Sequence, residues 1–409
     1  MLTSIAFIFL IGLSMAAICQ KLKLPRIIGM LITGIVLGPY VLNLLDPSIL
    51  SISSELRQMA LIIILLKAGL SLNLSDLKKV GRPAIMMSCV PASFEILAFF
   101  LFAPYLLEVS RIEAAVMGAV LGAVSPAVVV PRMVQLMDSR YGTQKSIPQL
   151  VMAGASCDDI FVIVLFTTFV SMAQGGQVHI MDFVNIPISI ILGIALGALV
   201  GFLLSIFFET AYAHKHCVRN SMKVIIVLGI SFMLMAIESW AEDFVSISGL
   251  LAVVSMACVL KLKSIAFVSK RLSEKFGKLW IAAEVILFVL VGAAVDIRYT
   301  MGAGLSAIAM IFLALIFRGI GVSICLVKTN LNWKERLFCV IAYLPKATVQ
   351  AAIGSVPLAM GLPCGQIVLS VAVLAILITA PLGAIGMDLT YKKLLTREEV
   401  NKSEAVRTE

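Results

Sequence analysis

Long runs of apolar residues, separated by short polar breaks, extend along the whole chain and restrict its fold more than any other feature. A helix needs about 20 apolar residues to cross a bilayer, and a lipid-exposed backbone must satisfy its own hydrogen bonds. The runs therefore predict an all-α polytopic membrane protein with about thirteen transmembrane helices. The composition agrees, because 61% of the 409 residues are hydrophobic and only 13% are charged. These values exclude a water-soluble enzyme, a disordered chain and a nucleic-acid-binding protein.

The positive charges in the polar breaks predict how the chain is oriented. With the N-terminus outside and the helices alternating in direction, all Lys and Arg in the breaks fall inside except Arg57, Arg111 and Arg298. Such a bias follows the positive-inside rule. The sequence therefore predicts an N-out, C-in topology, and one helix more or fewer in the middle would destroy the bias.

The predicted helices divide into six, one and six, and the two groups of six begin on opposite sides of the membrane. This is the arrangement of an inverted repeat, which is common in transporters. Segment 125–131 interrupts the fifth helix of the first half, and segment 344–350 interrupts the fifth of the second. Mid-helix prolines free backbone groups, which can then bind an ion. We therefore expect two broken helices that cross near the bilayer centre, with Pro126, Pro131, Pro345 and Thr348 at the breaks.

Five charged residues lie well inside apolar runs, where an ionised side chain costs at least about 2.5 kcal/mol. They are Glu95, Asp158, Asp159, Arg318 and Lys346. Glu95 and Arg318 lie in the fourth helix of each half, so we expect a structural ion pair between them across the repeat interface.

The adjacent Asp158 and Asp159 indicate a different role. Neighbouring residues on a helix point about 100° apart, so both carboxylates cannot face one partner. One can pair with a cation such as Lys346, while the other faces a water-filled cavity. Burial and a neighbouring anion both oppose ionisation of that carboxylate, so it can hold either a proton or a small cation. With hydroxyl ligands from Ser125 and Ser156, the pair predicts exchange of protons for Na⁺ or Li⁺.

At these residues the sequence resembles the cation:proton antiporter superfamily, in particular the sodium/proton antiporters with an Asp-Asp pair. The similarity is greatest to the branch that includes the animal exchangers of this type. Segment 154–160 resembles the ion-binding helix of the family, segments 122–131 and 344–352 resemble its two broken helices, and segment 24–39 resembles its typical opening.

The resemblance implies a homodimer whose mobile core carries the ion by an elevator-like movement. Residues 1–81 and 221–300 would form the dimer domain, 82–175 and 301–390 the core, 176–220 a linker helix and 391–409 a cytoplasmic tail. Asp159 would be the shared cation and proton carrier, and Asp158 would pair with Lys346. Many electrogenic members have Lys where this chain has Arg318, and because Arg stays protonated, one-for-one exchange is the expectation.

The main alternative is a sodium-coupled symporter of a small organic anion, which Lys346 and Arg318 could attract. An intramembrane aspartyl protease is excluded because its two carboxylates must face each other across one water, whereas these diverge on one helix. We expect membrane lipid around the protein, no cofactor and no nucleic-acid partner. The short chain without a targeting extension favours a bacterial inner membrane. Gly193, Gly197 and Gly201 recur every four residues and predict close helix packing.

Overall fold

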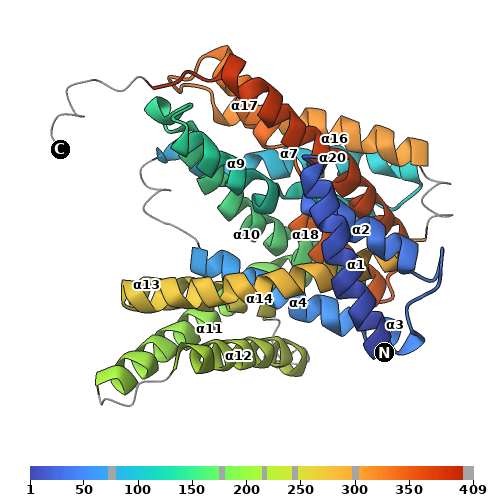
Figure 1. The fold of residues 1–409 in the computed structure, drawn as a ribbon, viewed down its shortest axis with the longest axis vertical. Helices are drawn as coiled ribbons and strands as arrows, with labels where there is room; N and C mark the ends of the chain where they lie inside the picture. Colours follow the sequence, from blue (N-terminus) through green and yellow to red (C-terminus); the bar gives the residue numbers. More distant parts are fainter. Residues whose placement is uncertain (72–79, 175–179, 214–218, 242–246, 297–303, 399–409) are drawn as a thin grey trace.

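The protein is all-helical in a computed structural model that describes residues 1–71, 80–174, 180–213, 219–241, 247–296 and 304–398. The helices pack into two groups (Figure 1). The site group contains α6 (Arg82–Met87), α7 (Val90–Leu107), α8 (Arg111–Gly122), α9 (Pro126–Asp138), η1 (Thr143–Lys145), α10 (Ile147–Gln174), α16 (Gly304–Cys325), α17 (Trp333–Ala342), α18 (Thr348–Gly354), α19 (Val356–Ala359) and α20 (Gly365–Leu394).

The flanking group packs beside it, in the lower and right-hand parts of Figure 1. It contains α1 (Leu2–Lys21), α2 (Arg26–Leu37), α3 (Pro47–Ser51), α4 (Ser53–Ser71), α11 (Ile180–Ala213), α12 (Asn220–Ala241), α13 (Gly249–Lys263) and α14 (Ala266–Ala293). The two groups touch where α10 meets α13 and α11, where α18 meets α4 and α14, and where α20 meets α2.

Nine helical segments of the described chain are long and apolar enough to cross a membrane. The sequence predicted about thirteen. The remaining four predicted intervals contain α2, α4, α13 and the α17–α18 pair, which are helical but short, charged or interrupted. In α4, for example, Glu55, Arg57 and Lys67 lie within 19 residues.

The starts of several helices follow from local hydrogen bonding. Ser110 and Glu113 form a capping box at α8, and Asn332 and Glu335 form one at α17. Such boxes satisfy backbone N–H groups that the first helical turn leaves without partners. α9 begins directly at Pro126, whose missing N–H costs nothing at the first position of a helix.

The close helix packing predicted from Gly193, Gly197 and Gly201 is confirmed. On α11, a Cβ atom at any of these positions would collide with the backbone of Ser248, which directly precedes α13, or of Ala252 and Met256 within α13. The absence of side chains therefore lets the two helices approach within backbone contact.

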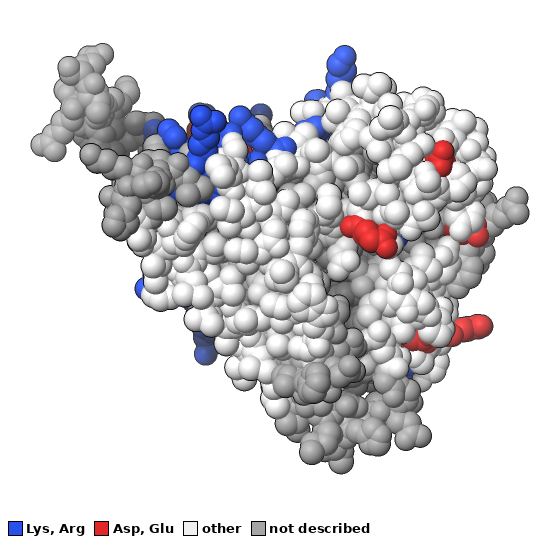
Figure 2. Space-filling model, turned by 90° about the horizontal axis from the view of Figure 1, so that it is seen from below, with Lys and Arg blue, Asp and Glu red and all other residues white. Residues whose placement is uncertain are grey.

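Three of the breaks predicted to lie inside come together at one end of the site group. Lys145 in the α9–α10 connection forms an ion pair with Glu335 on α17, with 2.8 Å between Nζ and Oε2. Tyr141 and Arg397 form an isolated antiparallel bridge, which joins the same connection to the chain after α20. Figure 2 shows a largely uncharged face whose Lys and Arg gather mainly along one edge.

Candidate ion-binding site

The two predicted helix interruptions are present, and they lie against each other in the site group. α8 ends at Gly122 and α9 begins at Pro126, while α17 ends at Ala342 and α18 begins at Thr348. The Ser125 N–H donates a hydrogen bond of 2.8 Å to the carbonyl oxygen of Pro345, which joins the two unwound segments directly. Four helix ends therefore converge at one buried place.

The position of the first interruption differs from the prediction. The sequence placed it at 125–131, but the non-helical residues are 123–125, and Pro131 lies inside α9 without ending it. A proline within a helix removes one hydrogen bond, and here the neighbouring turns keep the helix intact. In the second interruption, residues 343–347 are non-helical, and Thr348 already belongs to α18.

Asp158 is held rigidly in the middle of α10 beside the first interruption. Its Oδ2 accepts hydrogen bonds from the Val124 N–H at 2.8 Å and from Arg318 Nη2 at 2.9 Å. The residue is completely buried. Asp158 is thus bound to backbone and cation at once, as a buried carboxylate requires.

Glu95 on α7 binds two cations through a single oxygen atom. Its Oε2 lies 2.8 Å from Arg318 Nη1 and 2.8 Å from Lys346 Nζ. The ion pair expected between Glu95 and Arg318 is therefore present. The contact expected between Lys346 and Asp158 is not: Arg318 occupies the Asp158 carboxylate, and Lys346 turns to Glu95 instead.

Arg318 on α16 also binds the carboxyl ends of both interrupted helices. Its Nε donates to the carbonyl oxygen of Tyr343 at 2.6 Å, and its Nη1 donates to that of Gly122. Helix C-termini carry partial negative charge, so one guanidinium stabilises the ends of α17 and α8 together. A planar group with five fixed donors is suited to this, whereas a lysine is not.

Asp159 is the one charged residue of the cluster that the described cations do not balance. Arg318 and Lys346 balance Glu95 and Asp158, and Asp159 forms no ion pair among the described residues. Asp159 is 7% exposed, whereas Asp158 is fully enclosed. One oxygen atom of each of Asp158, Asp159 and Glu95, and the Tyr343 hydroxyl, have no hydrogen-bond partner in the part of the chain that the structure describes. Buried polar atoms without protein partners indicate a place for water or an ion.

The other predicted ligands are partly assembled. Ser125 Oγ lies 3.5 Å from Thr348 Oγ1, so the two hydroxyls face each other across the interruptions. Ser156 lies on α10, but its side chain is outside the described part of the structure. The described residues hold no group of three or more His, Cys, Asp or Glu able to bind a metal ion. The candidate donors are therefore carboxylate, hydroxyl and backbone oxygen atoms, which suit a hard monovalent cation.

Two contributors to the site were not among the predicted site residues. Gln350 on α18 bridges the two unwound segments, and Thr379 on α20 accepts the Lys346 N–H at 3.0 Å. Both are polar residues within apolar runs, which is the only signal the sequence offers for them.

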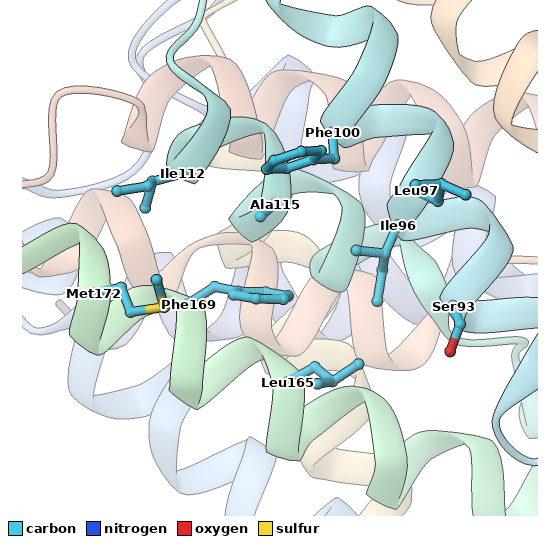
Figure 3. A pocket seen from close by; sticks show the side chains of 9 residues that line it. All are labelled: Ser93, Ile96, Leu97, Phe100, Ile112, Ala115, Leu165, Phe169 and Met172. Atoms are coloured by element: carbon cyan, nitrogen blue, oxygen red, sulfur yellow. The ribbon is translucent and has the colours of Figure 1, made fainter. Parts of the chain in front are cut away.

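A separate pocket of about 330 Å³ lies between α7, α8 and α10, and Figure 3 shows its side chains. It contains none of the charged residues of the cluster. Its lining is apolar apart from one serine hydroxyl: Ser93, Ile96, Leu97, Phe100, Ile112, Ala115, Leu165, Phe169 and Met172. This pocket therefore lacks the oxygen ligands that a cation needs.

Comparison with known proteins decides the family. Residues 5–391 match the family described as "Sodium/hydrogen exchanger, transmembrane". The chain belongs to the sodium/hydrogen exchanger family. It is an integral membrane transporter for sodium/proton exchange and not an enzyme, which confirms the function expected from the Asp pair and the broken helices.

Individual relatives agree with this assignment. Human sodium/hydrogen exchanger 9B2 is 34% identical over 402 residues, covering 94% of this chain and 73% of its own. Human sodium/hydrogen exchanger 9B1 is 32% identical, covering 91% and 73%. The fold is similar to that of the sodium proton antiporter MjNhaP1 from Methanocaldococcus jannaschii, with a TM-score of 0.81, 21% identity and coverage of 96% and 98%.

Proposed function

We propose that Asp159 is the shared carrier of this exchanger, holding a proton or one Na⁺ or Li⁺ ion in turn. The observation that carries this proposal is the charge balance of the cluster: only Asp159 has no cationic partner among the described residues. A buried carboxylate without a partner favours its neutral form, so it must bind either a proton or a metal cation.

The other charged residues have fixed roles in this proposal. Asp158 is locked by Arg318 and Val124, and it supplies negative charge and one free oxygen to the cation. Glu95 neutralises Lys346 and the second side of Arg318. Ser125 and Thr348 offer hydroxyl ligands, and Ser156 is a further candidate from α10. The exchanger is thereby of the Asp-Asp type.

The ion pairs that Arg318 and Lys346 form with carboxylates support sodium/proton exchange over symport of an organic anion. Both cations that could attract an anion already contact Glu95, and Arg318 contacts Asp158 as well. An anionic substrate would have to displace these buried carboxylates, and breaking such a pair costs on the order of 3 kcal/mol.

We further propose an inverted repeat of six helices around α11, with the N-terminus outside and the C-terminus inside. Two interrupted helices occur at matching places in the halves, which supports the repeat. The α9–α10 connection contacts both the start of α17 and the chain after α20. These contacts support placing the three basic segments on the same side of the membrane.

In the proposed mechanism the site group moves as a core against the flanking group, in the manner of an elevator. The division of packing between the groups supports this (Figure 1). Residues 1–81 and 221–300 would form the dimer domain against a second copy, within membrane lipid, and residues 176–220 would be the linker helix. The bacterial inner membrane as the location stays a prediction.

The test uses purified protein in sealed vesicles that carry a pH gradient and an internal pH dye. Addition of Na⁺ or Li⁺ should dissipate the gradient without any organic substrate. Asp159→Asn should abolish this response, while Glu55→Gln, an exposed carboxylate on α4, should leave it intact. Normal exchange by folded Asp159→Asn would show that the carrier is another residue.

A further inference from the structure

Gln350 is completely buried, and its side-chain amide is bonded at both ends to the unwound segments. Its Oε1 accepts the Ala347 N–H at 2.8 Å, within the second segment. Its Nε2 donates to the carbonyl oxygen of Ala123 at 2.8 Å, in the first segment. One side chain therefore crosses between the two halves of the protein at their point of contact.

The peptide group between Ala123 and Val124 connects Gln350 to the carboxylates. The carbonyl of this group accepts from Gln350, and its N–H donates to Asp158 Oδ2 at 2.8 Å. Because a peptide group is planar and rigid, fixing its carbonyl also fixes the direction of its N–H. Gln350 thus determines the orientation of the donor that holds Asp158, next to Asp159.

The first segment cannot fix this peptide group by itself. Ser125 precedes α9 but makes no side-chain cap to it, and position 128, which corresponds to Gln350 in the third position of its helix, is a valine. Ala123 has no polar side chain. The only other donor to its carbonyl among the residues described is Lys346 Nζ, at 3.5 Å.

We propose that Gln350 is a positioning residue for ion exchange, which fastens the Ala123–Val124 peptide and so holds the Asp158 and Asp159 site in its ion-binding geometry. This inference rests on the proposed function of Asp159. Gln350 touches neither carboxylate, and it acts through Val124.

A glutamate at this position gives a specific test. Protonated glutamate has one O–H donor and one acceptor oxygen, so it can keep both hydrogen bonds of Gln350. Ionised glutamate cannot donate to the Ala123 carbonyl. The charged groups around this position are Lys346 on the same segment, Glu95 on α7, Asp158 on α10 and Arg318 on α16.

We therefore expect Gln350→Glu to exchange Na⁺ nearly as the unchanged protein does at acidic pH, and to lose apparent Na⁺ affinity as pH rises. Gln350→Leu should have a half-saturating Na⁺ concentration roughly tenfold higher at every pH, because both buried groups lose their partner. Thr33→Val on α2 is the matched control, since it removes the hydrogen bond of a buried side chain, from the Thr33 hydroxyl to the Gly29 carbonyl, outside the site. It should keep the original pH profile.

The measurement is the half-saturating Na⁺ concentration and the maximal rate in vesicles at several pH values, with melting temperature as a check on folding. A Gln350→Glu profile that parallels the unchanged protein would overturn the positioning role, even if stability falls. If the unchanged protein shows no Na⁺-evoked proton movement, the proposed function fails. Exchange by the unchanged protein with an unshifted Gln350→Glu profile overturns only the role of Gln350.

Discussion

At the scale of single residues, the stability of the site depends on Glu95, because this one carboxylate contacts both buried cations. Arg318 and Lys346 share one oxygen atom of Glu95, and the carboxyl ends of α8 and α17 depend on Arg318 in turn. Buried ion pairs contribute little compared with apolar packing, but removing one member leaves an uncompensated charge. Loss of Glu95 therefore leaves Lys346 without a carboxylate partner and Arg318 with Asp158 alone.

Replacing Glu95 with Gln should destabilise the protein strongly. Because Lys346 and one side of Arg318 lose their carboxylate, we expect a loss on the order of 3 kcal/mol, seen as a lower melting temperature in detergent. A control variant, Glu55→Gln, removes an exposed carboxylate and should change the melting temperature little. Equal melting temperatures for the two variants would contradict a central role for Glu95.

At the scale of helices, hydropathy and local chemistry predicted the existence of the helices better than their interruptions. Pro131 and Pro381 both lie inside intact helices, and Pro126 begins one. The presence of a proline in the sequence does not reveal whether it begins a helix or lies inside one. α6 and α7 are also separated at Ser88 and Cys89, within one continuous apolar run where we predicted no break.

The partners of buried charges were also beyond sequence reasoning. The five intramembrane charges could be identified because each is costly in an apolar run. Which cation meets which carboxylate depends on how α7, α10 and α16 cross, and this crossing cannot be derived from the apolar runs alone. For this reason the predicted partner of Lys346 was wrong. Gln350 and Thr379 act through backbone groups, and such contacts leave no pattern in a single sequence.

The contact between α11 and α13 gives a prediction at the helix scale. In Gly197→Ala the new methyl group meets the Ala252 carbonyl, which belongs to the backbone and cannot move aside cheaply. We expect a loss of about 2 kcal/mol, measured by thermal unfolding in detergent.

The matched variant is Gly229→Ala, in the middle of α12, where no described atom beyond the neighbouring backbone of the same helix lies within 4 Å of the added methyl group. It should leave stability unchanged or raise it by about 0.5–1 kcal/mol, because alanine favours a helix more than glycine does. A Gly197→Ala protein as stable as Gly229→Ala would mean that the two helices do not pack closely.

At the scale of the whole molecule, the charges of the site group restrict the stoichiometry. Arg318 stays protonated in any working pH range and is fixed by Glu95, Asp158 and two backbone carbonyls. It cannot serve as a second proton carrier. With Asp159 as the proposed carrier and Lys346 held by Glu95, one proton should move for each monovalent cation.

One-for-one exchange carries no net charge, so an imposed membrane voltage should not change its rate. The measurement is Na⁺-evoked proton movement in vesicles whose voltage is set by a potassium gradient and a potassium ionophore. Rates at positive, zero and negative voltage should agree within error. A rate that rises with voltage of one sign and falls with the other would show that a second charge moves.

Competition at Asp159 is tested most directly by binding without transport. Na⁺ affinity of the purified protein is measured by calorimetry from acidic to alkaline pH, with the protons released counted in buffers of different ionisation enthalpy. We predict one proton released per Na⁺ bound at acidic pH, an affinity that weakens about tenfold for each pH unit lowered there, and loss of both effects in Asp159→Asn. Na⁺ binding that releases no proton and keeps the same affinity at every pH would contradict the account.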